Sequence, residues 1–177
     1  MQYIIKKARI VFNYSLSIIF LFFGIIKSSG QPGSCQGLLE SLNGKKPFPT
    51  EKEADYLRCL STIETEYGKT IQKNRDISKD IEKWNSDLRR KNSELERARQ
   101  NNDTINVTKF TLEAEQITKD LNTSKEKLDT NSLQMTAYKK ILSASYSRMI
   151  NYFEEEKENS AQAKPYRDKL DNLNKPN

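Results

Sequence analysis

The stretch that decides the fold is residues 60–98, LSTIETEYGKTIQKNRDISKDIEKWNSDLRRKNSELERA. Counting from Leu60, the first and fourth positions of each heptad form two rows, and nine of their twelve residues are apolar. A chain that is 35% hydrophobic would place only about four there by chance. Two apolar rows at this spacing are typical of a helix that packs along one stripe against another helix. We therefore expect a long helix here.

A second heptad pattern begins at Val107 and continues to Tyr152, with eleven apolar residues at its fourteen first and fourth positions. It is out of phase with the first pattern, and the break falls on the polar residues 100–104, QNNDT. Asn tolerates the left-handed backbone at a helix end, and Asp103 or Thr104 can cap a new helix. These features favour a turn between two antiparallel helices over a stutter in one continuous helix.

The two patterns together predict an all-α protein built on a long antiparallel, coiled-coil-like helical hairpin. We expect the hairpin over residues 50–160, with its turn near 100–106, because residues 50–164 contain no proline and a single glycine. Thr50 and Glu53 have the spacing of a capping box, which predicts the start of the first long helix.

Additional apolar residues near the end of the second helix need cover, which predicts a thicker base of the hairpin. These residues are Leu133, Ala137, Ile141, Ala144, Tyr146, Ile150 and Phe153. Short helices in residues 31–49 and 161–177 are the candidates to pack there. The first carries Leu38, Leu39 and Leu42, and the second carries Tyr166, Leu170 and Leu173 after Pro165.

Residues 1–30 have the character of a signal peptide. Three basic residues precede an apolar stretch at 10–26, and the small residues Ser28, Ser29 and Gly30 favour cleavage before Gln31. The alternative is a retained signal anchor, which leaves a single-pass membrane protein with a cytoplasmic N-terminus. Both interpretations predict that the rest of the chain is exported, to a periplasmic or extracellular location.

Charge and composition exclude several classes of function. Without the four basic residues of the N-terminal segment, 26 basic side chains stand against 24 acidic ones, which gives no electrostatic reason to expect nucleic acid. The chain has no histidine. This excludes histidine-dependent catalytic triads, imidazole general bases and most zinc sites. No phosphate-binding loop is present either. We expect a protein that is not an enzyme and has no cofactor or metal.

Cys35 and Cys59 are the two cysteines, and both follow the predicted signal peptide. In an exported chain such a pair predicts a disulfide, which would tether the N-terminal segment and contribute about 3 kcal/mol for a loop of this size. Two separate buried thiols, or lipidation of Cys35 after Gly33-Ser34, are the alternatives.

Candidate partner-binding residues lie near the predicted turn. Arg89, Arg90 and Lys91 form a basic run, and Trp84 is an aromatic residue at a fourth heptad position. The favoured interpretation is a solvated helix surface beside a core tryptophan, and the alternative is a partner site with Trp84 as its anchor. The acidic run Glu154, Glu155, Glu156 and Glu158 is likewise interpreted as a solvated face.

Three sites match the N-glycosylation pattern in this region, at Asn102, Asn106 and Asn122. The chain is rich in Asn, Ser and Thr, so these matches do not identify a eukaryotic secretory pathway.

Two classes of function stay open. The first is an exported structural or interaction protein that binds a partner protein, or a copy of itself, through helices. The polar seam residues Asn74 and Asn131 favour it, because two helices with a weakly packed seam are stabilised when they pack against further helices. The second is a membrane-anchored coiled-coil spacer across an extracytoplasmic gap. In outline the first resembles periplasmic holdase chaperones of the Skp type, and the second resembles phage spanins.

Overall fold

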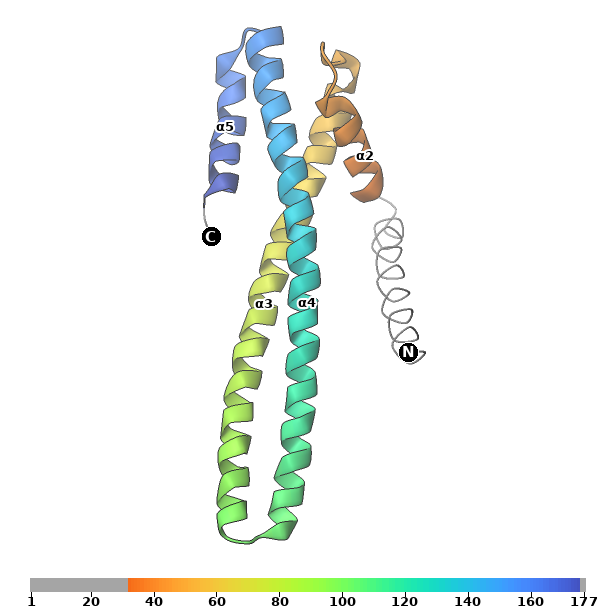
Figure 1. Ribbon diagram of the computed structural model, residues 1–177. Helices are drawn as coiled ribbons and strands as arrows, with labels where there is room; N and C mark the ends of the chain where they lie inside the picture. The colour runs from red at the N-terminus through yellow and green to blue at the C-terminus, as the bar shows by residue number, and fades with distance from the viewer. Residues whose placement is uncertain (1–31, 176–177) are drawn as a thin grey trace, which may run out of the picture. The chain divides into compact units, whose positions relative to one another are not determined.

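The computed structural model describes residues 32–175, and the signal peptide predicted for 1–30 lies outside this range. The described residues form helices and no strand. In chain order these are α2 (Pro32–Asn43), the 3-10 helix η1 (Thr50–Lys52), α3 (Glu53–Gln100), α4 (Thr104–Asn151), the π-helix η2 (Tyr152–Glu156) and α5 (Ser160–Asn174). The long helices α3 and α4 pack against each other (Figure 1), so the predicted all-α helical hairpin is confirmed.

The chain divides into two compact units. The hairpin unit is residues 65–140, which are the larger part of α3 and of α4. The terminal unit contains the described residues before and after this range, including α2 and α5. None of the described helices combines the length and the apolar character that crossing a membrane requires.

The turn of the hairpin unit closes α3 and starts α4 with three consecutive residues. Asn102 has a φ of 55°. Its N–H donates to the carbonyl of Arg99 at 3.1 Å, and the N–H of Asp103 donates to the carbonyl of Ala98 at 2.9 Å. This pair of bonds is a Schellman motif with Asn in the left-handed position. The Asp103 carboxylate then accepts the N–H of Asn106 at 3.1 Å, so the predicted turn and cap are both present.

The seam of the hairpin unit follows the two heptad rows. Ile77, Leu95, Ala98 and Leu121 are buried, but so are the polar residues Thr70 and Asn131. The hydroxyl of Thr70 donates to the carbonyl of Glu66 at 2.8 Å, which satisfies it within its own helix. Within residues 32–175, the side-chain nitrogen of Asn131 has no hydrogen-bond partner. The seam therefore contains a polar position that costs stability.

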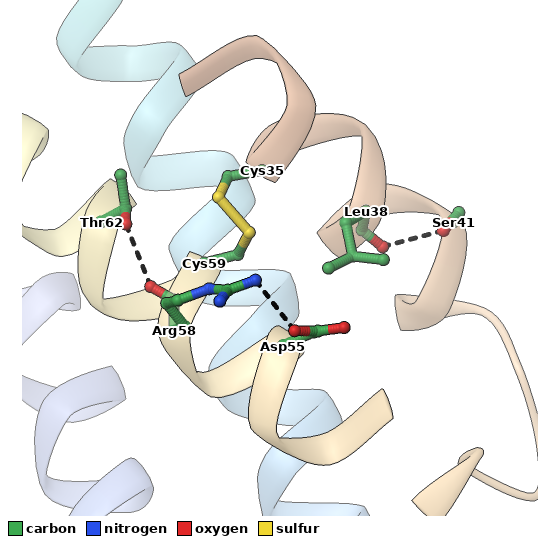
Figure 2. Close-up of a disulfide and its surroundings, with 7 residues drawn as sticks. All are labelled: Cys35, Leu38, Ser41, Asp55, Arg58, Cys59 and Thr62. Atoms are coloured by element: carbon green, nitrogen blue, oxygen red, sulfur yellow. Dashed lines mark hydrogen bonds and ion pairs between the residues drawn. A yellow bond between two sulfur atoms is a disulfide. The ribbon is translucent and has the colours of Figure 1, made fainter. Parts of the chain in front are cut away.

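A disulfide joins the two cysteines in the terminal unit, as the sequence predicted. Cys35 of α2 is bonded to Cys59 of α3, with their Cα atoms 4.8 Å apart (Figure 2). This bond places α2 so that Leu39 and Leu42 are buried. The pair also indicates an oxidising environment, since such bonds persist outside the reducing cytosol.

The core of the terminal unit combines aromatic packing with buried polar groups. Tyr56 is fully buried and donates its hydroxyl hydrogen to the side-chain oxygen of Asn43. Burial raises the pKa of the Tyr56 hydroxyl to about 12, against a smaller lowering effect of Ser145. Tyr152, also buried, donates to Glu53 at 2.7 Å. On the α5 side, the ring of Tyr166 stacks on that of Phe153 with centroids 5.8 Å apart.

Three details differ from the sequence prediction. The capping box is wrong, because α3 is preceded by η1 and the carboxylate of Glu53 accepts from Tyr152. The last helix, expected within residues 161–177, includes Pro165 within it. It begins at Ser160, where the side chain of Asn159 accepts the N–H of Gln162 at 3.2 Å. Of the apolar residues expected to need cover, Ile141, Tyr146 and Phe153 are buried, whereas Leu133, Ala137 and Ala144 are exposed.

Candidate interaction surface

The structure separates the four predicted partner-binding residues. Trp84 and Lys91 lie half-buried in the seam of the hairpin unit, whereas Arg89 and Arg90 are exposed. Arg90 forms an ion pair of 2.9 Å with Asp87 on the same helix. These residues therefore do not form one continuous surface.

Lys91 connects the two helices of the hairpin unit. Its ammonium lies 2.6 Å from Glu113 on α4 and 2.7 Å from Glu94 on α3, and its side chain is only 17% exposed. The ammonium also lies 5.0 Å from the centre of the Phe110 ring. The hydrogen bond to Glu113, followed by that to Glu94, raises the pKa of Lys91, and the same bond lowers the pKa of Glu113. Lys91 is thus engaged inside the hairpin.

The acidic run is a solvated face only in part, which corrects half of the sequence interpretation: Glu155 and Glu158 are exposed, whereas Glu154 and Glu156 are half-buried. Glu156 accepts the N–H of Phe48 at 2.6 Å and pairs at 2.7 Å with Arg148, whose side chain is 2% exposed. Burial alone would raise the pKa of Glu156, but the Phe48 N–H and Arg148 outweigh it and lower that pKa. Glu154 pairs with Arg167 of α5, and Glu155 pairs with Lys46. Glu154 and Glu156 thus connect parts of the terminal unit, and no group of metal-ligand residues occurs among residues 32–175.

The three glycosylation patterns lie at and beyond the turn. Asn102 and Asn122 are exposed, the first in the turn and the second in α4. The side-chain nitrogen of Asn106 donates to the Asp103 carboxylate at 2.6 Å. A glycan on Asn106 would be attached to the nitrogen that makes this capping contact.

The outer face of α4 carries the most unusual surface of the hairpin unit. The large hydrophobic residues Ile105, Leu112 and Leu133 of α4 are 80%, 61% and 62% exposed. All three occupy the heptad position opposite the seam, which we call the α4 outward row. The row consists of six exposed residues, Ile105, Leu112, Lys119, Glu126, Leu133 and Lys140.

The outward row of α3 provides an internal comparison. Its residues in the hairpin unit occupy the same heptad position and are all exposed and polar: Thr65, Gln72, Lys79, Ser86, Ser93 and Gln100. If both helices only faced water, we would expect both outward rows to be polar. Several large apolar side chains exposed on one row instead indicate a surface that contacts another molecule. Half of the α4 outward row is apolar, so that row is the candidate interaction surface.

A shallow hollow lies at the turn-proximal end of the α4 outward row. It is lined by Thr104, Ile105, Thr108, Lys109, Leu112 and Glu113. Its lining combines the apolar side chains of Ile105 and Leu112 with the charged side chains of Lys109 and Glu113. Such a combination suits an apolar side chain of another polypeptide better than a charged small molecule.

Comparisons of the chain with protein-family models, with curated proteins and with solved structures find no match.

The outward row could have been found in the sequence. Once the second heptad pattern is phased from Val107, the position opposite the seam reads Ile105, Leu112 and Leu133 among charged residues. The seam positions alone do not include Leu112, and they predict a covered base for Leu133, because they identify the residues that face α3 and not those on the opposite face of α4.

Proposed function

We propose that the protein is an exported, non-enzymatic interaction module that binds a helix of another polypeptide chain through the α4 outward row. The observation that carries the proposal is the contrast between two exposed rows of the same hairpin. The α3 row is polar throughout, whereas the α4 row exposes Ile105, Leu112 and Leu133. An apolar stripe on one helix face is the usual complement of a second helix.

Export is supported by the disulfide between Cys35 and Cys59 together with the signal-like residues 1–30. Structural disulfides form and persist in oxidising compartments and are rare in the reducing cytosol. N-terminal sequencing of the protein recovered outside the cytoplasm tests this part. A chain that begins near Gln31 supports a cleaved signal peptide, and an intact N-terminus in the membrane fraction contradicts it.

Binding through the α4 outward row is tested by site-specific photo-crosslinking in cells that make the protein. A photo-reactive amino acid replaces Leu112 in one variant and Ser93 in a matched variant, because both residues are exposed outward positions of the same unit. We expect the probe at position 112 to give a discrete protein adduct, identified by mass spectrometry, and the probe at 93 to give none. Absence of any protein adduct at 112 would show that this face is not an interaction surface.

A further inference from the structure

The order of apolar and charged residues along the α4 outward row indicates which kind of binding partner the row suits. Four consecutive members, seven residues and thus about 10 Å apart, are Leu112, Lys119, Glu126 and Leu133. All four are exposed. Within residues 32–175, neither Lys119 nor Glu126 has an ion-pair partner, and the same holds for the other charged residues of α4 in the hairpin unit apart from Glu113. Two charges between two apolar residues are therefore available to a binding partner.

This order is self-complementary when it is read in opposite directions. If a second copy of α4 lies antiparallel on the first, Leu112 faces Leu133 of the second copy and Lys119 faces its Glu126. The same two contacts occur again across the two-fold axis. A parallel arrangement in register would instead place Lys119 against Lys119 and Glu126 against Glu126, which is repulsive.

The neighbouring row on one side permits a close approach of two helices. The residues four places after each member of the set are exposed and uncharged: Gln116, Thr123, Thr130 and Ala137. On the other side, by contrast, the residues three places after Leu112 and Glu126 are Glu115 and Asp129. An antiparallel partner that leans toward the uncharged side avoids contact between these acidic residues. The two-fold axis then lies level with Asn122 and Thr123.

We propose that two copies of this protein pair antiparallel through the α4 outward rows, with Leu112 against Leu133 and Lys119 against Glu126 of the other copy. The row extends the contact at both ends, where Ile105 faces the aliphatic stem of Lys140. This proposal rests on the proposed function, since it names the partner that the same surface binds. It also names the residue of the other copy that each charged residue of the row contacts.

Charge reversal tests this pairing by sedimentation equilibrium of the purified mature protein at low salt. K119E places two acidic residues opposite each other at both symmetric contacts, and we expect it to weaken self-association about tenfold. E126K should weaken self-association equally, because it places two lysines opposite each other at both symmetric contacts. The double variant K119E/E126K exchanges the two charges, so it should return self-association to the original strength.

The matched control is K79E, which makes the same change of net charge on the exposed α3 outward row. We expect its self-association to equal that of the unmodified protein. Circular dichroism of each variant confirms that the helices are retained, and recovery in the double variant shows that folding is not the cause of the loss. Equal weakening by K79E, or failure of the double variant to recover, would contradict the pairing.

Crosslinking through introduced cysteines determines the direction of the helices. L112C and L133C are about 30 Å apart on one helix. We expect a mixture of the two single variants to form a disulfide-linked dimer, and neither variant to do so alone. A dimer formed by L112C alone would indicate a parallel arrangement and overturn the proposal.

The photo-crosslinking experiment distinguishes failure of this inference from failure of the proposed function. An adduct at position 112 with a second copy of the chain supports both. An adduct with a different protein overturns the antiparallel pair and leaves the interaction surface in place. A protein that stays monomeric at all concentrations and gives no adduct contradicts both.

Discussion

The ammonium of Lys91 on α3 lies 2.6 Å from the carboxylate of Glu113 on α4. This contact crosses the hairpin unit close to the turn and places a lysine at a seam position where the heptad pattern calls for an apolar residue. Because the aliphatic stem is half-buried while the charged end is paired, the residue fixes the alignment of the two helices and does not merely weaken their packing.

Glu113→Gln should therefore lower the melting temperature of the hairpin unit, measured by Trp84 fluorescence. The change removes a charge-assisted bond and leaves Lys91 with Glu94 alone. The difference between variant and parent should shrink in 1 M salt, where the screening length is about 3 Å. Glu96→Gln is the control, because the exposed Glu96–Arg99 pair lies within one helix. An equal effect of both substitutions would contradict the role given to Glu113.

The same pair has a defined pH dependence. Lys91 lowers the pKa of Glu113 below its ordinary value of 4.5 in the folded protein. The contribution of Glu113 to stability is thus fully present above pH 4.5 and is lost as the pH falls through the lowered pKa. The destabilising effect of Glu113→Gln should accordingly disappear in acid.

Asn131→Leu should stabilise the hairpin unit by roughly 1–2 kcal/mol. Asn131 is 3% exposed in the seam, and within the described residues its side-chain nitrogen has no hydrogen-bond partner. Replacement by an apolar side chain of similar size removes this cost and adds apolar burial. Urea denaturation followed by Trp84 fluorescence measures the change. A decrease in stability would show that the amide makes a favourable contact, for example to a bound water.

The seam and the turn could be predicted from the sequence, because both depend on local and periodic information. The heptad rows identify the buried faces, and the polar break at 100–104 identifies Asn102 and Asp103 as cap residues. These features need no knowledge of which distant residues meet.

The terminal unit could not be predicted to the same extent, because its key contacts join distant residues. Glu156 receives the N–H of Phe48, which no periodicity connects to it. Residues 152–156 also form a π-helix, which changes the angular order of the side chains, so the half-burial of Glu154 and Glu156 does not follow from an α-helical projection. The outward row of α4, by contrast, can be predicted from the heptad pattern of the sequence.

Reduction of the Cys35–Cys59 disulfide should lower the stability of the terminal unit by about 3 kcal/mol, since the released loop gains entropy in the unfolded chain. Near-ultraviolet dichroism of the tyrosines measures the change during urea denaturation, because four of the six tyrosines among residues 32–175 lie in this unit. The variant C35S/C59S should behave like the reduced protein and should not respond to reductant. Two titratable thiols in the denatured, unreduced protein would contradict the bond.

The terminal unit should unfold in alkali, and Tyr56 should carry part of this sensitivity. Burial raises the pKa of Tyr56 from 10.0 to about 12, and burial together with the bond to Glu53 raises the pKa of Tyr152 as well. In the unfolded chain both hydroxyls ionise near pH 10. Their contribution to stability is thus fully present below pH 10 and is lost as the pH rises from 10 through the raised pKa of each hydroxyl, which for Tyr56 is about 12.

Tyr56→Phe tests this account because it affects two quantities differently: the free energy of unfolding at pH 7, and the decrease of that free energy with pH. At pH 7 the variant should be less stable by about 1 kcal/mol, because the hydrogen bond to Asn43 is lost. Between pH 10 and 12 its free energy of unfolding should fall less steeply than that of the parent, since one ionising group has been removed. Tyr67→Phe is the control, because Tyr67 is half-buried in the other unit. If Tyr56→Phe and the parent lose stability with the same slope above pH 10, the buried hydroxyl of Tyr56 is not what makes the terminal unit sensitive to alkali.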